Sequence, residues 1–324
     1  MIIKWAANVK LSYQDLGHGI FCIDTFYYRP NLDGCYLIRE GDEAALIDTG
    51  TSHVVPAVME LIALQGLRPE QVKYIIPTHV HLDHAGGTGQ LMAALPNAEM
   101  IIHPLGAQHM IHPEKIIAGT IAVYGEEIFE QRYGSILPVP EARTIVAEDG
   151  FELSLSGRKL KCLHTLGHAR HHLCVWDEQS RGIFTGDTFG ISYRELDTDQ
   201  GPFMFLPSTP IDFDPDTWHE TLDRLTSLNP EQLYLTHFCR VDQPALRAEK
   251  LHEEIDAYVA IAQAASGEQR EQQIREQLSH YYQTQLKAHG STLSSQEIDE
   301  VLGMDIALCA QGLDIWMKRQ EKQR

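Results

Sequence analysis

Positive charge and long apolar runs are what this sequence has least of. Against 45 Asp and Glu residues stand only 26 Lys and Arg, which gives a formal net charge of −19. Proteins that bind nucleic acid through its phosphates present a basic face, and anionic membrane surfaces also attract basic residues. No apolar run approaches the roughly 18 residues that a transmembrane helix needs. We therefore expect neither a nucleic acid nor a membrane as partner.

Cysteine pairs and targeting segments are also missing. The six cysteines form no CxxC pair, and most lie in apolar, strand-like runs such as LKCL and HLCVW. The opening residues MIIKWAANVKLSY contain neither the apolar core nor the cleavage site of a secretory signal. These features predict buried free thiols in a cytoplasmic protein rather than a disulfide framework.

Short runs rich in Val, Ile and Tyr dominate the chain up to about residue 236, which indicates a sandwich of two β-sheets. Examples are IFCID, CYLIR, VKYII and GIFTG, each bounded by Gly, Asp or polar residues. Helical patterns interrupt them at about residues 53–65, with Ser52 as N-cap, and at 87–95, 114–133 and 216–228. Strand pairs that alternate with helices favour an α/β fold, a four-layer αββα sandwich with helices outside two packed sheets.

The composition changes after about residue 243, where Ala, Glu, Gln and Lys dominate and strand patterns end. Three helices are predicted, over residues 245–265, from after Ser266 to near Gly290, and from the capping box Ser294–Glu297 to about Arg319. The last one has an apolar face that includes Ile298 and Trp316. We expect a catalytic domain over residues 1–243 and a helical extension over 244–324. The apolar face packs on the core domain or, alternatively, forms a homodimer or a lid.

The segment PTHVHLDHAGG carries four strong metal ligands within six residues. His79 and His81 alternate with apolar residues, so in extended backbone both rings point to the same side. Asp83 and His84 follow on a turn and reach a second point nearby. Imidazole and carboxylate ligands suit Zn²⁺, with Fe or Mn as alternatives.

Further ligands follow three later strands. His168 comes after KLKCL, Asp187 after GIFTG, and His237 after LYLT. Each lies at the carboxyl end of its strand, and we expect the loops that follow these ends to lie together at one edge of the sandwich. The sequence therefore predicts a seven-residue site for two divalent metal ions.

THVHLDHAGG resembles the metal-binding motif of the metallo-β-lactamase superfamily, and the resemblance extends from about Ile20 to Cys239. It implies that His79, His81 and His168 bind one metal ion, that Asp83, His84 and His237 bind the other, and that Asp187 bridges them. Asp48, in ALIDTG, matches an aspartate that supports the ligands. The family's third-ligand motif usually has proline where Leu166 stands here. No cysteine occupies the zinc-ligand position of the antibiotic-hydrolysing members.

The resemblance implies a binuclear hydrolase of the glyoxalase II or lactonase-like branch, acting on a small-molecule substrate. A hydroxide shared by the two metal ions would cleave a thioester, ester, lactone or phosphoester bond. Asp83 is the expected proton-handling residue, and Tyr193 the candidate hydrogen-bond donor to a developing oxyanion. The alternatives are a persulfide dioxygenase with a single iron and a non-catalytic effector that keeps its metal ions.

Other residues near these motifs are interpreted as structural first. His171 and His172 are expected to be hydrogen-bonded rather than ligands, and His103, His109 and His112 to lie on the surface or in the pocket wall. Four aromatic residues lie on loops that either wall the pocket or pack conventionally, namely Tyr27, Tyr28, Phe203 and Phe205.

Overall fold

The computed structural model describes residues 10–208 and 213–323 of the chain. Residues 1–9, which form most of the segment that contains no secretory signal, lie outside the described residues. The end of the loop GPFMFLPSTP also lies outside. The chain divides into two compact units. The first comprises residues 1–164, 171–186 and 231–240, and the second 165–170, 187–230 and 241–324.

The first sheet has seven strands that follow one another in chain order, and their pairing changes from antiparallel to parallel at β4. Strands β1 to β4 pair antiparallel, whereas β4 to β7 pair parallel. Parallel neighbours need a crossover connection, and α1 and α3 provide it after β4 and β5. The strands are β1 (Tyr13–Asp15), β2 (Ile20–Asp24), β3 (Gly34–Glu40), β4 (Glu43–Ile47), β5 (Val72–Ile76), β6 (Glu99–Ile102) and β7 (Thr144–Val146).

The second sheet has six strands in the order β15-β14-β11-β10-β9-β8. Strands β8 to β11 pair antiparallel, and β11 pairs parallel with β14. The strands are β8 (Glu152–Leu155), β9 (Arg158–His164), β10 (Leu173–Asp177), β11 (Gly182–Gly186), β14 (Gln232–Leu235) and β15 (Cys239–Asp242). A short antiparallel pair, β12 (Ile191–Ser192) and β13 (Met204–Phe205), belongs to the second unit.

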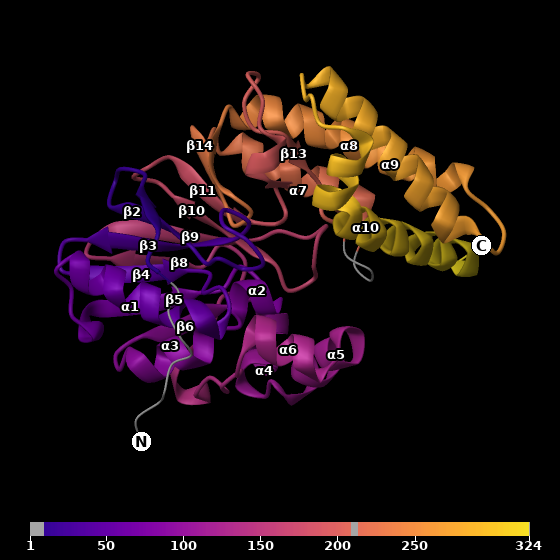
Figure 1. The fold of residues 1–324 in the computed structure, drawn as a ribbon. Helices are drawn as coiled ribbons and strands as arrows, with labels where there is room; N and C mark the ends of the chain where they lie inside the picture. Colours follow the sequence, from indigo (N-terminus) through magenta and orange to yellow (C-terminus); the bar gives the residue numbers. More distant parts are fainter. Residues whose placement is uncertain (1–9, 209–212, 324) are drawn as a thin grey trace. The chain divides into compact units, whose positions relative to one another are not determined.

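Strand β2 shows how the first unit is layered. All five of its residues are buried, and alternate side chains belong to two different cores. Ile20 and Cys22 lie in the core between the two sheets, whereas Phe21 and Ile23 lie in the core between the first sheet and its helices. Because side chains alternate along a strand, a strand covered on both faces is a continuous apolar run. Figure 1 shows α1 and α3 along this outer face of the first sheet.

The helices match most of the predicted ones, with two corrections. Thr51, and not Ser52, caps the first helical segment, because the Thr51 hydroxyl accepts from His53 N while the Ser52 hydroxyl donates to the Tyr133 carbonyl. The predicted helix over 114–133 is two helices, because Gly125 adopts a positive φ of 85° between them. The helices before residue 230 are α1 (Val55–Leu64), α2 (Leu82–Ala85), α3 (Thr88–Ala94), α4 (Pro104–Ile111), α5 (Glu114–Tyr124), α6 (Glu126–Tyr133) and α7 (Pro215–Ser227).

The end of the chain forms the three predicted helices, α8 (Pro244–Ala264), α9 (Arg270–Ala288) and α10 (Ser295–Gln323). The capping box is present, since Glu297 N donates to the Ser294 hydroxyl and Ser294 N donates to the Glu297 carboxylate. Within the second unit α10 packs against α8 and α9, with Ile298, Leu302 and Leu313 buried (Figure 1). Its apolar face is thus covered by neighbouring helices. The division of the chain at residue 243 stays a prediction.

The cysteines confirm the expectation drawn from composition. All six are buried thiols outside any disulfide, in agreement with the absence of a disulfide framework. None of the helices within residues 10–208 and 213–323 has both the length and the apolar character needed to span a bilayer.

Candidate metal centre

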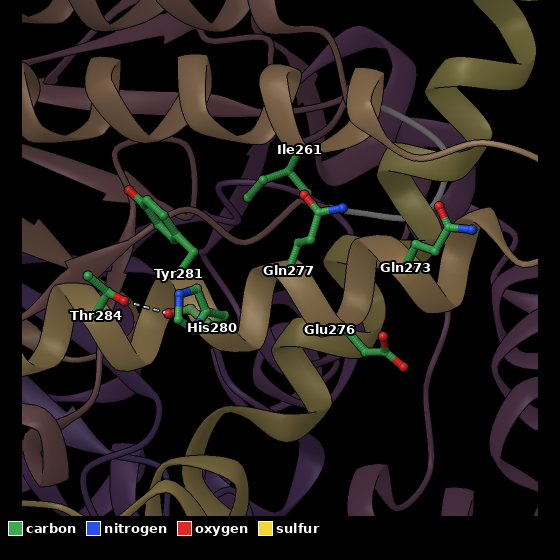
Figure 2. A pocket seen from close by; sticks show the side chains of 7 residues that line it. All are labelled: Ile261, Gln273, Glu276, Gln277, His280, Tyr281 and Thr284. Carbon is green, nitrogen blue, oxygen red and sulfur yellow. Dashed lines mark hydrogen bonds between the residues drawn. The ribbon is translucent and has the colours of Figure 1, made fainter.

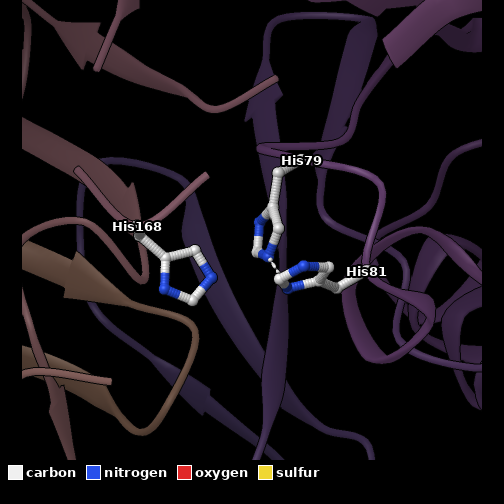
Figure 3. Close-up of side chains that lie close together, drawn as sticks. All are labelled: His79, His81 and His168. Atoms are coloured by element: carbon white, nitrogen blue, oxygen red, sulfur yellow. Dashed lines mark hydrogen bonds between the residues drawn. The ribbon is translucent and has the colours of Figure 1, made fainter. Parts of the chain in front are cut away.

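The motif THVHLDH follows β5 and turns directly into the short helix α2. His79 precedes the turn, and His81 is the residue before the first helical position. The Nε2 atom of His79 and the Nδ1 atom of His81 lie 2.7 Å apart, so two ligand atoms of the first unit meet at one point. Figure 3 draws these two rings and their contact, together with His168, which belongs to the second unit.

Asp83, His84 and His237 form a second group in the first unit. Each offers one ligand atom, and these atoms all lie within 4.8 Å of one another. The Asp83 Oδ2 atom is 3.7 Å from His237 Nε2 and 4.0 Å from His84 Nε2. His84 and His237 are buried, and Asp83 is half-buried. Two imidazoles and a carboxylate in this arrangement are a set that a divalent transition metal prefers.

The Nδ1 atoms of three of these histidines are held by the surrounding chain. The His84 Nδ1 atom lies 2.9 Å from Asp48 Oδ2, and the His237 Nδ1 atom lies 2.9 Å from the Leu32 carbonyl. The His79 Nδ1 atom lies 3.1 Å from the Thr78 hydroxyl. Metal-binding histidines commonly donate their second ring N–H to such partners, which fixes the ring and directs the other nitrogen to the metal. The donor set therefore fits a metal ion.

Asp48 is the centre of this supporting network. Its buried carboxylate accepts hydrogen bonds from Thr78 N at 2.7 Å and from the Thr236 hydroxyl at 2.7 Å, in addition to its contact with His84. Its φ is 55°, a left-handed conformation that Asp and Asn tolerate better than most residues. These contacts agree with the supporting role that the resemblance implied for Asp48.

Asp33 is a residue of this region that the sequence reasoning missed. It is fully buried, its Oδ2 atom accepts from the Thr25 hydroxyl at 2.7 Å, and its Oδ1 atom has no hydrogen-bond partner. Burial raises the pKa of Asp33 to about 8, while the nearby His237 and His84 act in the opposite direction. Asp33 immediately precedes β3, whereas the sequence reasoning considered ligands at the carboxyl ends of strands, such as Asp187, so this signal did not select it.

The two remaining predicted ligands belong to the second unit. His168 and Asp187 are both buried, and the His168 Nε2 atom lies 3.5 Å from Asp187 Oδ2. The His168 Nδ1 atom lies 2.8 Å from the Pro207 carbonyl, which is the same type of support as for His84 and His237. Each unit thus brings its own predicted ligands together.

The other histidines near the motif lie in different surroundings, and their structural role stays a prediction. His171 and His172 lie in the first unit beside His79, with ring centroids 6.1 Å and 4.9 Å from it. His103 stacks on His164 with centroids 4.0 Å apart, and burial lowers the pKa of His103 to about 4, so the ring is neutral at physiological pH. His112 is exposed at the end of α4, and His109 is half-buried there.

The aromatic residues take mainly packing roles. The Tyr27 hydroxyl donates to the Tyr133 hydroxyl at 2.8 Å, and Phe205 packs edge-on against Tyr193 with centroids 5.3 Å apart. The Tyr193 hydroxyl donates to Asp305 Oδ1 at 3.0 Å. The same proton cannot serve an oxyanion while it is donated to Asp305, and the catalytic role of Tyr193 stays a prediction. Tyr28 is 44% exposed, and Phe203 packs against His289.

A groove in the second unit is lined by none of the predicted ligands. Its volume is about 580 Å³, and it is formed by Ile261 of α8 together with side chains of α9. Figure 2 shows that Gln273, Glu276 and His280 all come from the single helix α9 and do not converge on one point. The residues that line this groove offer no set of converging metal ligands.

The comparisons with known proteins identify the family. The model of the metallo-beta-lactamase superfamily matches residues 35–237, which include all seven predicted metal ligands. The chain therefore belongs to the metallo-β-lactamase superfamily. Its membership makes it a metal-dependent hydrolase in the general sense of that superfamily, and its histidines and aspartates are able to bind metal.

The relatives include thioester-cleaving enzymes. The acyl-coenzyme A thioesterase MBLAC2 of Bos taurus is 26% identical over 57% of this chain and 67% of its own length. The hydroxyacylglutathione hydrolase of Francisella tularensis subsp. holarctica (strain FTNF002-00 / FTA) is 26% identical over 63% of this chain and 70% of its own length. These matches leave about a third of each relative unaligned.

A solved structure confirms the predicted fold. A metallo-beta-lactamase family protein of Thermus thermophilus is 21% identical and superimposes with a TM-score of 0.65 over 95% of both chains. The chain therefore has the αββα sandwich fold of the superfamily, as the order of its strands and helices predicted.

Proposed function

We propose that this protein hydrolyses an ester-like bond with a pair of divalent metal ions, and that a thioester is its first substrate to test. The observation that carries the proposal is the group formed by Asp83, His84 and His237, whose ligand atoms converge within 4.8 Å. Its histidines are oriented by Asp48 and by the Leu32 carbonyl. A site prepared in this way favours metal binding over a merely structural role for the histidines.

The proposed ligand set divides between two metal positions. His79, His81 and His168 would hold one ion, Asp83, His84 and His237 the other, and Asp187 would bridge the pair. Zn²⁺ is the expected metal because imidazole dominates the set, with Fe or Mn as alternatives. Bound ions would supply the Lewis acidity that lowers the pKa of water and polarises the bond to be cleaved.

The chain's own residues would orient the ligands and move the proton. The Asp83 carboxylate is half-buried and therefore reachable by solvent, which suits a residue that accepts a proton from the attacking water. Asp33 adds a second carboxylate close enough to interact with Asp83 and His237. With its pKa raised to about 8, this carboxyl is mostly protonated at neutral pH. A cation at the second position would favour its ionised form, since opposite charges attract strongly at low dielectric.

The names of two relatives support the choice of a thioester. One is a thioesterase for acyl-coenzyme A and the other hydrolyses hydroxyacylglutathione. In both, the bond cleaved joins an acyl group to a thiol. The site itself does not choose among ester-like bonds, because fold and ligand set do not fix the substrate.

The test is a substrate panel on protein of measured metal content. An acyl-coenzyme A, a hydroxyacylglutathione, a carboxylic ester, a lactone and a phosphodiester are compared with Zn²⁺-loaded protein. We expect the thioesters to be cleaved fastest, and the variants Asp83→Asn and His84→Gln to lose metal and activity together. The exposed His112→Gln variant serves as the matched control and should keep both.

Three outcomes contradict the proposal. Normal rates in Asp83→Asn at full metal content would contradict the assignment of Asp83 as a metal ligand. One iron per chain with oxygen uptake on a persulfide would favour the dioxygenase. Metal-loaded protein that cleaves no member of the panel would favour a non-catalytic effector.

A further inference from the structure

A second cluster of histidines and aspartates lies in the second unit, apart from the seven predicted ligands. Helix α7 packs against α8, and each contributes one histidine to their contact. The Nδ1 atoms of His219 and His252 lie 2.6 Å apart. The two rings are nearly parallel, with an angle of 3° between their planes.

Each ring turns its other nitrogen to a carboxylate of the opposite helix. The His219 Nε2 atom lies 3.5 Å from Asp256 Oδ1, and the His252 Nε2 atom lies 3.3 Å from Asp223 Oδ1. Asp223 follows His219 by four residues and Asp256 follows His252 by four, so each helix presents its pair on one face. The two helices thus carry the same His-x-x-x-Asp pattern, and the histidine of each helix contacts the aspartate of the other.

The carboxylates favour one placement of the ring protons. A carboxylate only accepts hydrogen bonds, so an Asp near Nε2 favours the tautomer with its proton on that nitrogen. When both rings have this tautomer, two Nδ1 lone pairs face each other at 2.6 Å and repel each other unless a cation lies between them. The alternative is a ring with its proton on Nδ1, which donates to the Nδ1 atom of the other ring.

We propose that His219 and His252 bind a divalent transition-metal ion through their Nδ1 atoms. Asp223 and Asp256 orient the rings, in the manner in which carboxylates commonly support metal-binding histidines. Two carboxylates and two neutral imidazoles carry a total charge of −2, which matches the charge of one divalent ion.

The two rings must move apart and turn to accept the ion between them. With bonds of about 2.0–2.1 Å, two nitrogen ligands of a tetrahedral metal lie roughly 3.3 Å apart, so the rings would separate by less than about 1 Å. The His219 and His252 side chains are 29% and 27% exposed, which leaves room for this movement and lets water complete the coordination. His79 and His81 show the same close approach of two imidazole nitrogens in the main centre, at 2.7 Å.

The experiment counts bound zinc. Wild-type protein and the double variant His219→Gln/His252→Gln are equilibrated with micromolar free Zn²⁺, freed of excess metal on a sizing column, and analysed by elemental and native mass spectrometry. We expect the double variant to hold one zinc ion fewer per chain. The exposed His280→Gln variant of α9 is the matched control and should hold as many as the wild type.

A second pair of substitutions tests the role of the carboxylates. Asp223→Asn/Asp256→Asn keeps both imidazoles and should weaken binding of this one ion roughly 10-fold to 100-fold, with the ions of the main centre unaffected. Equal zinc counts in the wild type and in the folded histidine double variant would overturn the proposal and leave a shared proton between the rings. Loss of the ion from His280→Gln would overturn it as well.

Discussion

The His84 Nδ1 atom lies 2.9 Å from Asp48 Oδ2, and both side chains are completely buried. The two residues are 36 positions apart in the chain and come together because β4 and β5 are parallel neighbours in the first sheet. A buried carboxylate against an imidazole fixes the orientation of the ring. Asp48 therefore determines how well His84 is presented to a metal ion.

Asp48→Asn is predicted to weaken metal binding at the Asp83, His84 and His237 group about 10-fold to 100-fold. Asn is the suitable substitution, because it tolerates the φ of 55° and keeps the size of the side chain. The measurement is a competition titration with a metal-buffering chelator. Asp24→Asn is the control. Asp24 is also a buried aspartate, but its carboxylate accepts hydrogen bonds from the backbone N–H groups of Phe26 and Asn31 and not from a predicted ligand. Equal metal affinity in Asp48→Asn and wild type would show that the contact does not orient His84.

Asp33→Asn is predicted to lower the affinity for the second metal ion roughly tenfold or more, because a bound cation would favour the ionised form of the buried Asp33 carboxyl and Asn cannot ionise. The same chelator titration measures it, and Asp24→Asn again serves as control. Unchanged stoichiometry with a weaker second binding step is the expected pattern. Should both binding steps keep the wild-type affinity, Asp33 has no part in the centre.

Arg158→Met is predicted to destabilise the protein by about 3–5 kcal/mol, because it leaves the buried Asp177 carboxylate without its partner. Arg158 Nε donates to Asp177 Oδ1 at 2.9 Å, and both side chains are fully buried. Urea unfolding gives the difference in the free energy of unfolding. The control is Arg181→Met, whose ion pair with Glu231 is about half exposed and should contribute about 1 kcal/mol or less. A loss for Arg158→Met as small as that of the control would contradict the assignment.

Glu254→Gln is predicted to change how stability depends on pH. Burial raises the pKa of Glu254 to about 7, whereas the unfolded chain has the ordinary value near 4.5. Between these two values the folded protein holds a proton that the unfolded chain has released, so stability falls as the pH rises from about 4.5 to about 7. Gln keeps the acceptor for the Tyr282 hydroxyl, which Glu254 Oε1 provides at 2.6 Å.

Urea unfolding of both proteins at pH 5 and pH 8 measures this effect. The variant should show little of the fall, and above pH 7 it should be the more stable protein by on the order of a few kcal/mol. Parallel pH profiles for the variant and the wild type would mean that Glu254 does not titrate in this range.

The sequence was sufficient where the signal is local. The strand IFCID (β2) and the capping box Ser294–Glu297 were predicted because neighbouring residues determine them. The local pattern gave the wrong N-cap where two neighbouring residues can both cap the same helical segment. Ser52 and Thr51 both can cap a helix, and the carbonyl of Tyr133, far away in the sequence, engages Ser52 and leaves the cap to Thr51.

The sequence by itself determined the metal-binding motif and the fold, because the order of ligand types after His79 and the succession of strands and helices are properties of the linear chain. Only the tertiary structure decided which buried groups surround those ligands. It placed Asp48 against His84, Asp33 near His237, and His219 against His252. Such contacts join residues far apart in the chain, and their energies depend on burial and on the facing charge, which arise only when the strands and helices pack together.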